Sequence, residues 1–278
     1  MWVQRFIDTT RGAFELFVAG QGEPLAVTHL YCAFNEKGNL FANPFTSHYR
    51  VYLINLRGCG NSVKADHEGQ YSMNETVLDL EAIRVALGLE KWGFGGHSTG
   101  GMLALKYAIV APSSLTKIIA GGAAASIEYG LDPDSIYCYE NKNFNRIIDI
   151  MDKLNESSTQ VEERQKLGYE WALMSYFSEE KLKEALTKPN SGKTVGARLD
   201  YFRKIECKTY DLRNDLEDVK LPSYIYAGKH DAQCPYKFGI EIANLLPNST
   251  FITFEESNHN PFSEEEEKFQ EFVRLTTV

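Results

Sequence analysis

The chain has 278 residues, of which 43% are hydrophobic and 24% are charged, a balance typical of a globular protein with a substantial core. Its formal net charge of −9 argues against nucleic acid or an anionic membrane as a partner. Five scattered cysteines never form a C-x-x-C pair, which disfavours a disulfide framework or a structural zinc site. We see no signal peptide and no apolar run of membrane-spanning length, so we expect a cytoplasmic location.

Short apolar segments alternate with helical patterns through the first part of the chain. A capping box at residues 72–75 predicts a helix that stops at Gly88, and a second helix is predicted from Gly101 to just before Pro112. Alternating strands and helices are typical of βαβ units with a mostly parallel sheet. The predicted strands are 13–19, 25–29, 51–55, 92–95 and 115–121.

The pattern changes between residues 123 and 212, where we find no convincing strand but several charged helical stretches. After Pro222 the strand–helix alternation resumes, with strands at 224–228 and 251–254. We therefore predict one α/β domain, built from residues 1–122 and 213–278 and interrupted by a helical insertion of residues 123–212. The predicted helices are 145–154, 161–177 and 179–186 in the insertion, and 238–246 and 264–275 after it. The run of four glutamates at 264–267 is interpreted as a solvated face where the last helix begins.

A G-x-S-x-G pattern spans residues 96–100, between a predicted strand and a predicted helix. When this pattern joins a strand to a helix, the serine lies on a sharp, strained turn, and small flanking residues prevent steric clashes. The turn exposes the hydroxyl, while the start of the helix supplies oriented N–H groups beside it. The pattern predicts Ser98 as a nucleophile. The alternative is an ordinary glycine-rich turn from strand to helix.

Three further segments strengthen this hypothesis. Residues 55–62 (N-L-R-G-C-G-N-S) resemble a D-x-R-G-x-G-x-S turn, and residues 228–231 (G-K-H-D) resemble a G-x-x-D turn. Residues 257–261 (S-N-H-N-P) stand where a triad histidine is expected. With these motifs the chain resembles the α/β-hydrolase superfamily, and within it the proline iminopeptidases and related small serine hydrolases. The resemblance implies an α/β-hydrolase fold with a helical cap, a small and partly hydrophobic substrate, and no cofactor or metal.

The order of a catalytic serine, acid and histidine in α/β-hydrolases assigns the remaining roles. Asp231 and His259 each follow a predicted strand, so both belong at the carboxyl edge of the sheet, where ligands gather in open α/β folds. We predict His259 as the base and Asp231 as the acid that orients it. Glu128 is the alternative acid, because some family members take it from the segment after the sixth strand. The other histidines considered are interpreted as neighbours of the site or as surface residues: His48, His67, His97 and His230.

The oxyanion hole requires two N–H donors. We predict the backbone N–H of Thr99, directly after the serine, and that of Tyr31. Relatives usually read H-G before the second donor, whereas this chain reads His29-Leu30-Tyr31. Because a positive φ at Leu30 would cost conformational free energy, the loop must take another path or carry strain. This departure weakens the peptidase assignment more than the hydrolase assignment.

The preferred hypothesis is a cofactor-free serine hydrolase that cleaves a small ester, or less readily an amide, through an acyl-enzyme. An iminopeptidase is the alternative within the family, and it would need acidic groups in the insertion, such as Glu140, Glu162 and Glu163, to hold an amino group. A catalytically silent small-molecule receptor is the alternative of another class. The sequence leaves the oligomeric state open.

Overall fold

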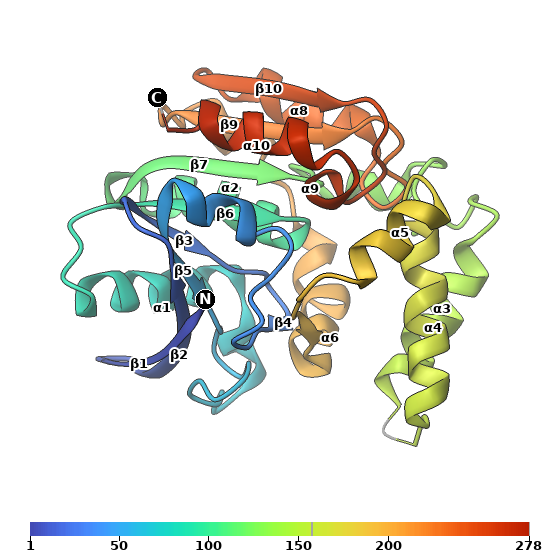
Figure 1. Ribbon diagram of the computed structural model, residues 1–278, viewed down its shortest axis with the longest axis horizontal. Helices are drawn as coiled ribbons and strands as arrows, with labels where there is room; N and C mark the ends of the chain where they lie inside the picture. Colours follow the sequence, from blue (N-terminus) through green and yellow to red (C-terminus); the bar gives the residue numbers. More distant parts are fainter. Residues whose placement is uncertain (157, 278) are drawn as a thin grey trace.

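The protein is built around one twisted β-sheet. The computed structural model describes residues 1–156 and 158–277. Its strands are β1 (Val3–Thr9), β2 (Gly12–Ala19), β3 (Glu23–Val27), β4 (Cys32–Ala33), β5 (Tyr49–Ile54), β6 (Trp92–His97), β7 (Leu115–Gly121), β8 (Lys193–Thr194), β9 (Ser223–Gly228) and β10 (Ser249–Phe254). In the described chain, eight of them form a sheet in the order β1-β2-β5-β3-β6-β7-β9-β10 (Figure 1). β1 and β2 pair antiparallel, and the strands from β5 to β10 in this order run parallel.

The predicted strands are all present, with ends shifted by a few residues. β1 is not predicted, because it is an edge strand with mostly exposed side chains and therefore lacks an apolar pattern. The helices are α1 (Met73–Ala86), α2 (Thr99–Val110), α3 (Phe144–Asn155), α4 (Val161–Met174), α5 (Glu179–Leu186), α6 (Gly196–Lys204), α7 (Arg213–Leu216), α8 (Tyr236–Leu245), α9 (Pro261–Glu264) and α10 (Glu266–Leu275). This architecture confirms the predicted α/β-hydrolase fold, a mostly parallel sheet flanked by helices.

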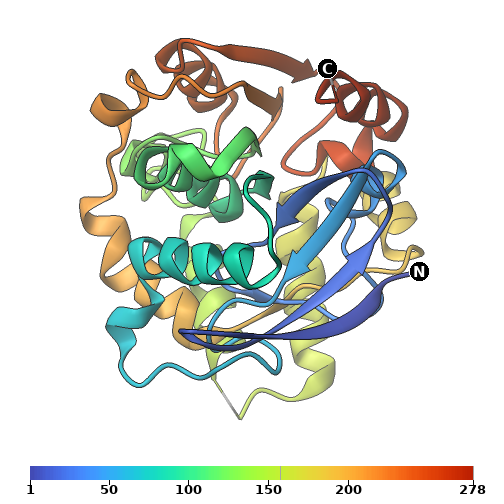
Figure 2. The same ribbon diagram turned by 90° about the vertical axis from the view of Figure 1, so that its left-hand side faces the viewer.

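Helices cover both faces of the sheet because side chains along each strand alternate between two apolar cores. In β3, Ala26 belongs to the core beneath α1, α2 and α8, whereas Leu25 and Val27 belong to the core beneath α10. Figure 2 shows the teal helix α1 and the red helix α10 on opposite sides of the sheet. No helix in residues 1–156 or 158–277 is long and apolar enough to cross a lipid bilayer.

The segment between β7 and α7, referred to below as the inserted segment (residues 123–212), carries α3 to α6. Figure 1 shows α3 and α4 side by side, standing away from the sheet. The expectation of no strand in this segment is wrong, because β8 pairs antiparallel with β4 next to His29-Leu30-Tyr31. Both strands are only two residues long, so no apolar periodicity could have indicated them. The pairing ties the inserted segment to the loop that follows β3.

Candidate active site

Ser98 lies at the turn between β6 and α2. Its backbone has φ 57° and ψ −126°, and it is the one non-glycine residue with positive φ in the described chain. The flanking glycines are required by packing: a Cβ at Gly96 would lie 2.0 Å from the Gly100 carbonyl oxygen, and one at Gly100 would lie 2.4 Å from the Thr28 oxygen. The Ser98 N–H donates to the Gly121 carbonyl at 2.9 Å, which holds the turn against β7. The residue itself is half-buried, and it lines a cavity.

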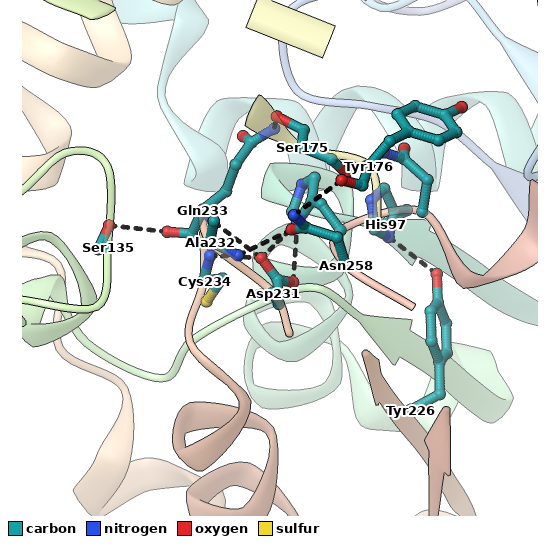
Figure 3. Close-up of polar contacts among 12 residues, drawn as sticks. His97, Ser135, Ser175, Tyr176, Tyr226, Asp231, Ala232, Gln233, Cys234 and Asn258 are labelled. Atoms are coloured by element: carbon teal, nitrogen blue, oxygen red, sulfur yellow. Dashed lines mark hydrogen bonds and ion pairs between the residues drawn. The ribbon is translucent and has the colours of Figure 1, made fainter. Parts of the chain in front are cut away.

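Asp231 and His259 meet at the carboxyl edge of the sheet, after β9 and β10. His259 Nδ1 lies 2.8 Å from Asp231 Oδ2 and 3.0 Å from Oδ1, and both residues are buried. Asp231 Oδ1 also accepts the backbone N–H groups of Gln233 at 2.9 Å and Cys234 at 2.8 Å (Figure 3). These donors fix the carboxylate, and the carboxylate in turn fixes the imidazole ring. His259 lines the same cavity as Ser98.

The end of α4 supports the His259 loop from above. The backbone N–H of His259 donates to the Ser175 carbonyl at 3.1 Å. Asn258 Nδ2 donates to the carbonyl oxygens of Met174 at 3.2 Å and Tyr176 at 3.3 Å, and Figure 3 shows Ser175 and Tyr176 beside Asn258. These carbonyls are available because a helix leaves its last C=O groups without intrahelical partners. The inserted segment is therefore bonded directly to the loop that carries His259.

The glutamate run does not behave as predicted for its first two members. The Glu264 side chain is buried and accepts the backbone N–H groups of Asn258, Asn260 and Phe177. Glu265 accepts the Ser257 hydroxyl at 2.7 Å. Burial raises the pKa of Glu264, an effect opposed by its backbone donors. The expectation of a wholly solvated face is wrong here, because α9 folds back onto the His259 loop before α10 begins.

The alternative acid, Glu128, lies away from His259 contacts. It forms an ion pair with Arg213 at 2.8 Å, and its side chain is 52% exposed. His48, His67 and His230 are exposed, and burial holds the pKa of His97 well below its ordinary value, with Nδ1 2.9 Å from the Tyr226 hydroxyl. Asp231 is thus the carboxylate that contacts the His259 ring. Among the residues that the structure describes, no three His, Cys, Asp or Glu side chains are arranged to hold a metal ion.

Tyr31, from the loop after β3, and Thr99, the first residue of α2, both lie on the wall of the cavity that contains Ser98. Leu30 is buried and does not have a positive φ. The loop therefore does not take the path that a glycine with positive φ would permit at this position. His29 links the two predicted donors: its Nε2 lies 3.3 Å from Thr99 Oγ1, and the Tyr31 N–H points to its Nδ1 at 3.4 Å. Burial lowers the pKa of His29 to about 3, which keeps this ring neutral.

The path of this loop is held by Arg198, a residue of α6 in the inserted segment. Its side chain is fully buried and donates to the carbonyl oxygens of Leu30 and Arg57, and to the Thr76 hydroxyl. The Val195 N–H adds a bond to the Tyr31 carbonyl at 2.8 Å. Arg198 is not among the residues predicted from the sequence, since nothing in a charged helical stretch distinguishes a buried arginine from an exposed one.

The cavity next to Ser98 has a volume of about 220 Å³ and is mostly apolar. Its walls come from the loop after β3, from the loop that carries His259, from η4 (Ile127–Leu131) and from α3, α4 and α6. Of the residues that the structure describes, neither an aspartate nor a glutamate lines it, and the carboxylate of Asp231 is bonded to the Nδ1 side of His259. The aromatic and aliphatic lining residues include Tyr31, Met102, Ile127, Tyr129, Leu131, Tyr137, Ile148, Met151, Trp171, Leu199 and Phe202.

Residues 29–266 match the family model described as alpha/beta hydrolase fold, so the chain belongs to the α/β-hydrolase family. A solved structure, an alpha/beta fold family hydrolase from Bacillus anthracis, is 63% identical, covers 99% of both chains and superposes with a TM-score of 0.98. The chain is 25% identical to a proline iminopeptidase from Heyndrickxia coagulans, over 97% of this chain and 96% of the relative. It is 23% identical to a pimeloyl-[acyl-carrier protein] methyl ester esterase from Vibrio cholerae, over 94% and 96%. The family assignment supports a hydrolase.

Proposed function

We propose that the protein is a serine hydrolase that cleaves small esters through an acyl-enzyme. Ser98 Oγ attacks the ester carbonyl, and His259 accepts the hydroxyl proton and later passes it to the leaving alcohol. Asp231 holds the imidazole in the tautomer that leaves Nε2 free to accept that proton. The N–H groups of Thr99 and Tyr31 stabilise the oxyanion. Water then attacks the acyl-enzyme by the same steps.

The observation that carries this proposal is the convergence of three features on one cavity. The strained Ser98 turn and the His259 ring both line it, and His259 Nδ1 is hydrogen-bonded to the buried carboxylate of Asp231. A free serine hydroxyl is a weak nucleophile, so a base oriented by a third group at this position has a chemical purpose. The inserted segment forms much of the cavity wall, which suits a cap that excludes water and selects substrates by shape.

The lining of the cavity favours an ester over a peptide with a free amino terminus. An aminopeptidase needs a carboxylate to hold the ammonium group of its substrate, and the described cavity offers none. Glu140, Glu162 and Glu163, the candidates in the inserted segment, are exposed and do not line it. The esterase relative supports the same choice, whereas the iminopeptidase relative supports the alternative.

Labelling with a fluorophosphonate, followed by steady-state turnover of p-nitrophenyl esters, tests the proposal. We expect Ser98 to be labelled, repeated turnover by the wild type, and neither labelling nor turnover by Ser98→Ala. Proline p-nitroanilide serves as the matched aminopeptidase substrate, and we expect it to be cleaved far more slowly. Labelling without turnover would instead indicate the silent receptor, and preferred cleavage of the anilide would indicate the iminopeptidase.

A further inference from the structure

Among the described residues that line the Ser98 cavity, Arg203 is the one arginine or lysine. It belongs to α6, whose Leu199 and Phe202 line the same cavity, and its side chain is half-buried. Other partly buried arginines of the protein have partners: Arg84, for example, pairs with Glu81 at 2.8 Å, and Arg164 donates to three backbone carbonyl oxygens. No ion pair and no side-chain hydrogen bond joins Arg203 to any described residue. Within the described part of the chain, the cavity wall thus carries a cation that has no acidic partner.

The charge of Arg203 acts inside the cavity as well as at its edge. Burial raises the pKa of the Tyr31 hydroxyl, and the Arg203 guanidinium is among the groups that oppose this effect. Tyr31 and Ser98 line the same cavity, so the charge acts on groups of the cavity wall. A second donor belongs to another residue that lines the cavity: the buried indole N–H of Trp171, beside Tyr137, has no acceptor of ordinary geometry in the described structure.

We infer that the substrate is an ester that carries a carboxylate, and that this carboxylate pairs with Arg203 while Ser98 attacks the ester carbonyl. The inference rests on the proposed function and narrows it to a class of substrate. A guanidinium binds a carboxylate through two parallel N–H···O bonds, and apolar walls strengthen the pairing by reducing solvent screening.

The single positive charge of Arg203 narrows the class of ligand further. A single arginine neutralises one negative charge, which suits a carboxylate better than a phosphate dianion in a chain whose formal net charge is −9. The same cation repels an ammonium group, so the inference and the absence of a lining carboxylate both disfavour a substrate with a free amino terminus. An anionic substrate is repelled by the protein as a whole and attracted by this cavity.

The experiment compares isosteric esters that differ only in the terminal group. Monoethyl adipate and ethyl hexanoate place a carboxylate or a methyl group on the acyl side, and 6-acetoxyhexanoate and hexyl acetate do so on the alcohol side. Acid release is followed in a pH-stat for the wild type, Arg203→Met, Arg203→Lys and Lys204→Met. Lys204 is the matched control, because it removes one positive charge from the same helix, is exposed and pairs with Asp200 outside the cavity.

For at least one pair, we expect the wild type to prefer the carboxylate by about tenfold in kcat/KM, which corresponds to about 1.4 kcal/mol. Arg203→Met should abolish or reverse this preference, measured as the ratio of kcat/KM for the two esters of a pair within the same variant. Arg203→Lys should keep part of the preference, Lys204→Met should keep all of it, and added salt should weaken it. Equal carboxylate preference in the wild type and Arg203→Met, or none in either, would overturn the inference.

Binding separates this inference from the proposed function. In the Ser98→Ala background, calorimetric titration measures the affinity for monoethyl adipate and 6-acetoxyhexanoate without turnover. We expect binding of one of them to weaken about tenfold when Arg203→Met is added. If neutral esters are hydrolysed but Arg203 has no effect in either assay, the carboxylate inference fails alone. If no ester is hydrolysed but Arg203-dependent binding persists, the proposed function fails while the anion site stands.

Discussion

Replacing Asp231 with asparagine should disable His259 without disturbing the fold. Asp231 Oδ1 accepts the N–H groups of Gln233 at 2.9 Å and Cys234 at 2.8 Å, so the asparagine side chain must place its carbonyl oxygen there. Its NH₂ group then takes the position of Oδ2, 2.8 Å from His259 Nδ1. Two donors cannot face each other, so Nδ1 becomes the acceptor and the ring proton moves to Nε2. In that tautomer His259 cannot accept the proton of Ser98.

The expected loss in kcat for Asp231→Asn is about 10⁴-fold, as for the equivalent change in the best-studied serine protease triad, or about 5.4 kcal/mol of transition-state stabilisation. Stability should change little, because the backbone N–H groups keep their acceptor. The assay is kcat for a p-nitrophenyl ester, with urea unfolding to check the fold. Glu128→Gln is the control, since its exposed pair with Arg213 lies outside the cavity, and its kcat should equal that of the wild type. A loss below tenfold in Asp231→Asn would refute the reasoning.

Three further substitutions test the strained turn at Ser98, the role of Tyr31 in the loop after β3, and the buried Arg198. Ser98→Gly should remove activity yet raise the free energy of unfolding by about 1 kcal/mol, because glycine tolerates φ 57°; a urea midpoint at or below that of Ser98→Ala would contradict this. Tyr31→Pro should lower kcat by about 10²–10³ through loss of the N–H donor, whereas Tyr31→Phe should leave kcat nearly unchanged; the reverse pattern would assign the role to the phenol, and circular dichroism checks the fold. Arg198→Met leaves three acceptors without their donor, so the free energy of unfolding should fall by about 3 kcal/mol in urea titrations; a loss below about 1 kcal/mol would show that the loop keeps its path unaided.

Local patterns in the sequence were enough to predict the α/β-hydrolase fold. Strands buried on both faces leave continuous apolar runs, and this explains the predicted strands 25–29, 51–55, 92–95, 115–121 and 224–228, whose residues are mostly buried. The capping box at Ser72 predicts the start of α1, and the structure shows the Ser72 hydroxyl accepting the Glu75 N–H at 3.2 Å. β1 and the pairing of β4 with β8 escaped prediction, because exposed or very short strands have no periodicity to detect.

The sequence by itself determined which residues stand at the ends of strands and on the Ser98 turn, because glycine spacing and strand periodicity are properties of neighbouring residues. Only the tertiary structure decided what surrounds them. Arg198 contacts Leu30 across 168 positions, and a buried or exposed arginine looks the same in a helical pattern. Glu264 likewise belongs to an acidic run that resembles solvent-facing surface, yet it is buried against the His259 loop. The cavity that Arg203 and Ser98 both line depends on how α6 packs against the loop after β3, which no local pattern encodes.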